Sequence, residues 1–286
     1  MTNKEFLNNI KELKNCPQNI SEIYKEFSEY QKLALNTLVC FDEICRKNDI
    51  TYTLAFGSLL GAIRDGGQIP WDYDVDVIVP INQRKKLIRA LEKDLNSEYY
   101  YNCIEKNEQC RYFIMRLAPL GYDSGYIHVD VFFIMGLPEN NAKGVKKKIQ
   151  SLALQLKSKS FFIMDNLKIN KRELVIMCFY KFVYLLKKRE KIIAQYFELV
   201  NRYDLLQTKK CCLADRFSTW YDFQTDMFFS TIDYKVDNYI FKIPEAYDEI
   251  LKMEYGNYLE YPSTDKQLEE MIVHYEFIVE HLKKKN

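Results

Sequence analysis

Two acidic residues with a single residue between them are the first candidates for chemistry in this sequence. Asp74 and Asp76 flank Val75, and an apolar run continues to Pro80. This alternation predicts a β-strand, on which residues two apart project from the same face. Two carboxylates held together repel each other unless a cation neutralises them, and Mg²⁺ is usually bound by one or two carboxylates together with substrate phosphate oxygens. A solvated loop would not need Val75 and Val77, so the acids are expected on a core strand with a bound cation. Such a pair predicts phosphoryl or nucleotidyl transfer.

A third acid and a phosphate-binding turn accompany this pair. Asp130 lies in a second apolar run, with His128 on the same predicted strand face. Upstream, Gly57 and Ser58 separate an aromatic, β-branched run from a helical one. A turn of this kind offers backbone N–H groups, a hydroxyl and a helix N-terminus to a phosphate. The predicted site therefore combines a metal cluster with a phosphate cradle.

Several nearby residues have two possible roles. Trp71 is either a core aromatic or a ligand contact, and Arg64 is either a surface charge or a phosphate ligand. His128 is either a structural histidine or a support for the acids. His274 and His281, seven residues apart on the last predicted helix, are expected at its solvent edge.

The elements that would position these residues follow from hydrophobic periodicity. An amphipathic helix is expected up to about residue 48, and a mixed α/β core is expected over residues 49–137. Residues 138–236 are expected to be a helical insertion, and residues 237–286 a C-terminal segment on the core, within one integrated domain. The predicted core strands are 51–56, 74–79, 111–117 and 126–134, and the predicted helices are 59–64, 82–95 and one starting at 264.

Composition limits the classes of function. The chain has 286 residues, 48% of them hydrophobic and 28% charged, so it can bury a core and is expected to fold throughout. Its 41 Lys and Arg balance 40 Asp and Glu, and a net charge of +1 gives no global field that would attract nucleic acid. No stretch reaches the roughly 18 apolar residues of a membrane span. We therefore expect a cytoplasmic protein without a nucleic-acid partner.

A basic segment leaves a peripheral membrane contact open. Lys143, Lys146, Lys147 and Lys148 precede an apolar, Lys-rich run at residues 174–189. A basic amphipathic helix can lie on the inner leaflet, although a buried helix with a solvated basic end gives the same pattern.

The eight cysteines have irregular spacing and no Cys-x-x-Cys, so they are expected to be reduced thiols buried like small hydrophobic residues. Cys103 with Cys110 and Cys211 with Cys212 are the pairs that could suggest zinc, but they lack zinc-site spacing and nearby histidines.

Two runs in the sequence resemble a known family. Residues 55–64, AFGSLLGAIR, and residues 69–76, IPWDYDVD, closely resemble the LicD family of phosphocholine transferases, which belongs to the nucleotidyltransferase superfamily and is related to the fukutin group. Residues 129–132, 241–244 and 254–262 extend the resemblance over most of the chain. Many relatives have Thr at Ser58 and an acid at Tyr73, and neither departure removes a necessary group.

The resemblance implies the role of each site residue. Gly57 and Ser58 would form the phosphate-contacting turn, with Arg64 as a further phosphate ligand. Asp74, Asp76 and Asp130 would bind Mg²⁺ or Mn²⁺ in a two-metal site, and Asp130 would accept the proton of the attacking hydroxyl. Trp71, Asp72 and His128 would support them.

The reaction implied is transfer of a phospho-alcohol from a CDP-linked donor to a sugar hydroxyl of a surface glycan, such as lipopolysaccharide, capsule or teichoic acid, or of its lipid-linked precursor, with release of CMP. CDP-choline, CDP-ribitol and CDP-glycerol are all candidate donors. The aromatic residues of segment 217–223 could surround a choline ammonium, or they could simply be core.

Two other functions use the same features. A nucleotidyltransferase that moves NMP from an NTP would also need Gly-Ser and Asp-x-Asp, but it would lack the PWDYDVD run. A non-catalytic glycan-binding module could arise from a decayed transferase, although all three acids are present here.

Overall fold

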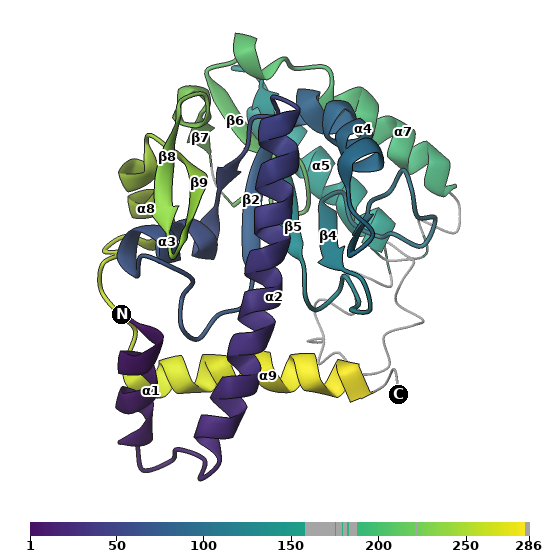
Figure 1. Ribbon diagram of the computed structural model, residues 1–286. Coiled ribbons are helices and arrows are strands. Elements are labelled where there is room, and N and C mark those ends of the chain that lie inside the picture. Colours follow the sequence, from purple (N-terminus) through teal and green to yellow (C-terminus); the bar gives the residue numbers. More distant parts are fainter. Residues whose placement is uncertain (158–174, 176–178, 180–181, 183–187, 221, 284–286) are drawn as a thin grey trace.

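The computed structural model describes residues 1–157, 175, 179, 182, 188–220 and 222–283. In this part of the chain, helices cover a mixed β-sheet, and a two-stranded hairpin lies at its side (Figure 1). The predicted α/β (α+β) class, with a nucleotidyltransferase-like mixed sheet, is confirmed.

Strand β5 is the centre of the sheet. The strand order is β1-β2-β5-β4-β3, with β6 beside β5 and β7 beside β6. β2 and β5 are parallel, whereas the other neighbouring pairs are antiparallel. β5 pairs with β4 through its first residues and with β6 through its last. The strands are β1 Thr53–Leu54, β2 Val75–Pro80, β3 Tyr99–Asn102, β4 Met115–Pro119, β5 Val129–Leu137, β6 Lys210–Leu213 and β7 Phe223–Gln224.

The long helix α2 (Ile20–Lys47) crosses in front of β2 and β5, and α9 (Thr264–Lys283) crosses the lower part of α2 (Figure 1). Phe27, Ala34 and Leu38 recur at helical spacing on α2 and are almost fully buried. This buried stripe faces the core and confirms the predicted first helix. The other helices are α1 Asn3–Lys11, α3 Phe56–Arg64, α4 Arg84–Asp94, α5 Ala142–Lys157, α7 Arg189–Val200 and α8 Tyr247–Tyr255, with 3₁₀ turns at Ile81–Gln83, Leu205–Gln207 and Thr225–Phe228.

The predicted core strands exist, but several of their ends are wrong. The strand expected at 51–56 contains only Thr53–Leu54, and the two expected at 111–117 and 126–134 lie at Met115–Pro119 and Val129–Leu137. Strand β3 was not predicted. Its residues Tyr99–Asn102 carry no clear alternation, and pairing with β4 is what makes them a strand.

We expected residues 138–236 to be helical, but the described part of this segment also contains β-strands. It contains α5 and α7, but β6 and β7 join the main sheet, and β8 (Thr231–Val236) forms a hairpin with β9 (Tyr239–Pro244). A short strand beside an existing sheet edge is stabilised by that edge, which local sequence does not reveal. The four-part division of the domain stays a prediction.

The lysine-rich segment has a defined position. Lys143, Lys146, Lys147 and Lys148 lie on α5, and the Lys146 ammonium forms an ion pair with Asp222. Most of the expected helix at 174–189 lies outside the described residues, so contact with a membrane surface stays a prediction. Within the described ranges, no helix is long and apolar enough to cross a membrane.

Candidate active site

Sheet register brings two of the predicted acids together. Asp76 on β2 and Asp130 on β5 are direct partners in the parallel ladder. Directly opposed residues on neighbouring strands project from the same face of a sheet. Asp74 immediately precedes β2 and continues the alternation of Asp76. The three acids predicted from sequence are therefore neighbours on one face of the sheet.

Asp130 is held by two nitrogen-bearing side chains. Arg116, its partner on β4, donates from Nε to Asp130 Oδ1 at 2.7 Å, and Nη2 lies 3.5 Å from Oδ2. His128 Nε2 lies 3.1 Å from the same Oδ1 atom. Burial alone would raise the pKa of Asp130, but His128 and Arg116 outweigh it and lower the pKa to about 2. This residue is therefore a stable anion.

Asp76 has the opposite environment. Burial, with the charges of Asp74 and Asp130, raises its pKa well above the usual value, and Arg116 offsets only part of this. Its side chain has no hydrogen-bond partner among the described residues. Such a carboxylate costs stability unless a cation binds to it.

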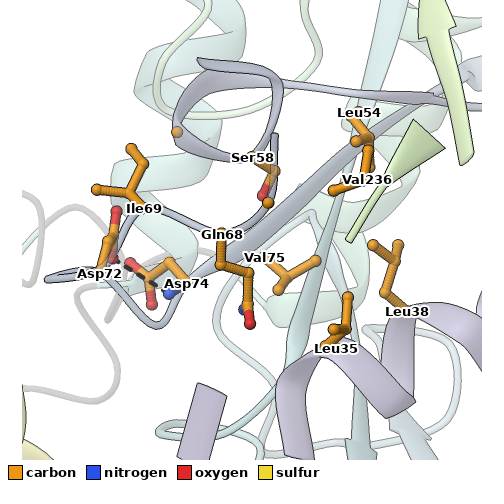
Figure 2. Close-up of a pocket in the computed structure, with 12 residues that line it drawn as sticks. Leu35, Leu38, Leu54, Ser58, Gln68, Ile69, Asp72, Asp74, Val75 and Val236 are labelled. Atoms are coloured by element: carbon orange, nitrogen blue, oxygen red, sulfur yellow. Dashed lines mark hydrogen bonds between the residues drawn. The ribbon is translucent and has the colours of Figure 1, made fainter. Parts of the chain in front are cut away.

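Asp72 and Asp74 form the loop that leads into β2. The Asp74 backbone N–H donates to Asp72 Oδ1 at 3.2 Å (Figure 2). Loss of water around Asp74 and the charge of Asp72 raise the pKa of Asp74 to about 6, although part of its side chain stays exposed. Gln31 on α2 fixes the loop through its amide, which donates to Ile69 O at 3.1 Å and Asp72 O at 2.6 Å.

We expected Gly57 and Ser58 to form a turn before a helix. Instead, both residues lie within the first turn of α3. The Ser58 hydroxyl accepts the backbone N–H of Asp76 at 2.9 Å, so it ties α3 to β2, and its own proton remains available to a phosphate. A Cβ atom at Gly57 would lie 3.2 Å from Asp72 Oδ2. Glycine therefore lets the loop carboxylate approach the helix N-terminus.

Two predicted site residues, Arg64 and Trp71, contact each other and other side chains of the core. Arg64 donates to Asp65 at 2.9 and 3.0 Å, its guanidinium lies over the rings of Trp71 and Tyr261, and its side chain is only 5% exposed. Trp71 is itself buried and contacts Phe6. This placement favours the core role for Trp71, and it makes Arg64 an enclosed partner of Asp65 rather than a surface charge or a phosphate ligand.

His274 was expected at a solvent edge, and it is partly exposed, but it also contacts the acidic loop. Its Nδ1 atom lies 3.2 Å from Trp71 O and 3.7 Å from Asp72 Oδ1, so α9 closes over the acidic loop. Sequence analysis also missed Arg116 and Gln31. Both carry a weak signal, since Arg116 sits between two apolar strand residues and Gln31 falls on the buried stripe of α2 one turn after Phe27.

A narrow cleft runs beside the acids. Gly57, Ser58, Asp72 and Asp74 line its polar side, and apolar residues of α2, β1 and β8 line the other, among them Leu35, Leu38, Leu54 and Val236 (Figure 2). Its free volume is about 20 Å³, which is enough for a water molecule. A nucleotide-linked substrate would therefore have to lie across the mouth of this cleft or widen it.

The carboxylate oxygens of the acids are suitable ligands for a hard cation such as Mg²⁺, but the side chains are not close enough together to form a metal site. Among the described residues, no three His, Cys, Asp or Glu side chains converge closely enough to hold a metal ion. Asp76 is nevertheless a half-buried carboxyl group, and the charge of Arg116 offsets only part of the repulsion from its neighbours Asp74 and Asp130. Asp130 is less available, because Arg116 and His128 share its Oδ1 atom. Asp74 and Asp76 are thus the better candidates for cation ligands.

A known protein family and a known protein are similar to this chain. Residues 49–151 match the family described as "LicD/FKTN/FKRP, nucleotidyltransferase domain". The chain is also 25% identical over 255 residues to the lipopolysaccharide cholinephosphotransferase LicD of Haemophilus influenzae, across 84% of this chain and 93% of that protein. The matched range contains all three acids, Gly57 and Ser58. The resemblance to the LicD family seen in the motifs is therefore confirmed over residues 49–151, which match that family's nucleotidyltransferase domain.

Proposed function

We propose that this protein transfers phosphocholine, or another phospho-alcohol, from a CDP-linked donor to a sugar hydroxyl of a surface glycan or its lipid-linked precursor. The observation that carries the proposal is the register of Asp76 with Asp130 beside the first turn of α3. The similarity to a lipopolysaccharide cholinephosphotransferase supports the choice of donor and acceptor.

In this reaction, the acceptor hydroxyl oxygen forms a bond to the phosphorus that carries the alcohol. The bond from that phosphorus to the bridging oxygen breaks, CMP leaves with the electron pair, and the hydroxyl proton must go to a base. Ser58 can donate its hydroxyl proton to a phosphate oxygen, and the first turn of α3 presents its backbone N–H groups nearby. These groups would orient the diphosphate for in-line attack.

Asp74 and Asp76 would hold the Mg²⁺ or Mn²⁺ ions, which when bound would neutralise charge on the phosphates. Asp130 suits our expected role as the base poorly, since its oxygens already pair with Arg116 and His128. We assign it instead to orientation, because its pairs with Arg116 and His128 fix that side of the acidic face.

The test is a CMP-release assay with purified protein and Mg²⁺, comparing CDP-choline, CDP-ribitol and CDP-glycerol, with a lipopolysaccharide preparation as acceptor. We expect metal-dependent CMP release from one of these donors and its loss in Asp76→Ala. Asp226→Ala is the matched control, because Asp226 is exposed and lies outside this site. Full turnover by a folded Asp76→Ala protein would refute the assignment.

The same assay separates the competing enzyme. Pyrophosphate release from an NTP, with no CMP release from any CDP-alcohol, would replace our proposal by nucleotidyl transfer. If neither reaction occurs and calorimetry detects no divalent metal, a non-catalytic glycan-binding module becomes the better explanation.

A further inference from the structure

A row of aromatic side chains starts beside the acids. Phe56, the first residue of α3, lies edge-on to Phe132 of β5 with ring centroids 5.2 Å apart. Phe132 is 6.2 Å from Phe217, and Phe217 is 4.1 Å from Trp220. Phe56 is half-buried, and beyond it exposure increases from 6% for Phe132 to 60% for Trp220. The row therefore leads from the sheet to the surface.

The beginning of this row is strained. Phe56 has a φ angle of 47°, in the left-handed region that bulky side chains rarely adopt. Backbone strain of this kind costs about 1–3 kcal/mol and is concentrated at functional sites. The strain places the Phe56 ring against Phe132, next to the helix turn that carries Gly57 and Ser58.

A buried acid lies two residues before Phe217 in the chain. Asp215 is only 5% exposed, and one of its oxygens accepts the Phe217 N–H at 2.7 Å. Burial raises the pKa of Asp215 to about 7. An ionised carboxylate here is therefore costly and would be stabilised by a nearby positive charge.

The row is close enough to the acidic face to share one ligand with it. Phe132 is two residues after Asp130 on β5, so both side chains project from the same face. Leu213 pairs with Ile134, and Ala214 N donates to Phe133 O, so the chain reaches Asp215 beside Phe132. Phosphocholine has a comparable layout, because only an oxygen and two methylene groups separate its phosphate from its ammonium.

We propose that Phe56, Phe132, Phe217, Trp220 and Asp215 form the subsite for the quaternary ammonium of the transferred group. This inference rests on the proposed function for the identity of the ligand. Ring faces and a carboxylate attract a bulky, weakly hydrated cation, whereas a glycerol or ribitol group would need hydrogen-bond partners.

Ring orientation favours a cation over a stacked base. Successive rings of the row are inclined to one another by 50° to 77°, and none of these pairs has the parallel faces between which a base would stack. Arg216 already places its guanidinium 4.3 Å from the centre of the Phe217 ring. The protein's own cation therefore binds one face of the row.

Trp220 makes the subsite measurable. It is one of two tryptophans, and the other, Trp71, is buried. We would titrate the protein with phosphocholine and with glycerol 3-phosphate, following tryptophan fluorescence and calorimetry. We expect phosphocholine to change the fluorescence and glycerol phosphate to bind without doing so.

The variants separate the subsite from the fold. Trp220→Leu should abolish the fluorescence change and weaken phosphocholine binding about fivefold. Asp215→Asn should weaken it by about tenfold without affecting glycerol phosphate. Phe229→Leu is the matched control, because this ring is 44% exposed but lies outside the row.

Two results would overturn the inference. One is equal phosphocholine binding by the wild-type, Trp220→Leu and Asp215→Asn proteins, and the other is a fluorescence change caused by CMP but not by phosphocholine. The donor assay distinguishes this failure from that of the proposed function. If both variants turn over CDP-choline with an unchanged KM, the proposed function stands and the subsite is refuted. If the variants weaken phosphocholine binding but no turnover occurs, the subsite stands and the proposed function is refuted.

Discussion

Replacing Asp76 by Asn should remove activity and stabilise the metal-free protein. Asp76 is a half-buried carboxylate whose neighbours Asp74 and Asp130 are also acidic. Neighbouring strands lie about 4.8 Å apart, and two unit charges at that distance interact by about 3 kcal/mol at an effective dielectric constant of about 20. Arg116 compensates part of this repulsion. We therefore expect Asp76→Asn to raise the free energy of unfolding by about 1–3 kcal/mol at neutral pH.

The assay is thermal unfolding in EDTA and then in Mg²⁺, combined with CMP release. In EDTA, the variant should melt about 2–6 °C above the wild type. Mg²⁺ should raise the melting temperature of the wild type through binding to the folded state, and it should raise that of the variant much less. The matched control is Asp226→Asn, an exposed substitution expected to change stability by less than about 0.5 kcal/mol.

A variant that melts below the wild type in EDTA would refute the electrostatic reasoning. A variant that keeps its CMP release would refute the assignment of Asp76 to the site. The two readouts are independent, because the first depends on repulsion in the folded protein and the second on phosphate chemistry.

Three further perturbations test other parts of the structure. Arg116→Lys, measured by the same donor assay, should lower kcat by about tenfold or more, because Lys cannot make the two-nitrogen contact with Asp130; an unchanged kcat would count against that contact. Burial raises the pKa of Glu254 to about 7, and its Oε2 atom has no hydrogen-bond partner among the described residues. Between about pH 4.5 and 7 the folded protein therefore holds a proton here that the unfolded chain has lost. The free energy of unfolding should fall by about 2–3 kcal/mol as pH rises through that range. In Glu254→Gln that contribution should vanish, which urea unfolding at pH 5 and pH 8 would reveal as a smaller pH dependence. Gly61→Ala should destabilise by about 1–3 kcal/mol, since the new Cβ would lie 2.6 Å from the backbone oxygen of Gly67; a variant as stable as the wild type in urea would contradict this clash.

Features that depend on nearby residues were readable from the chain. The apolar stripe of α2, the alternation around Asp76 and the helix from Thr264 all follow from periodicity within a few residues. The family motifs are similarly short, and they identified the acids and the Gly-Ser pair. Exact strand ends were less readable, because a ladder begins where a neighbour is available to pair.

Partners distant in sequence came only from the folded chain. The sequence left Arg64 as either a surface charge or a phosphate ligand, and only the fold places Trp71 and the distant Tyr261 against its guanidinium. Likewise, His274 is 203 positions from Trp71, whose carbonyl its Nδ1 atom approaches. No periodicity encodes such contacts, since they depend on how β-strands and helices pack after the chain has folded. Short sequence motifs therefore identify the acids of this site. Their charge, their partners and their access to a ligand depend on how distant segments pack around them.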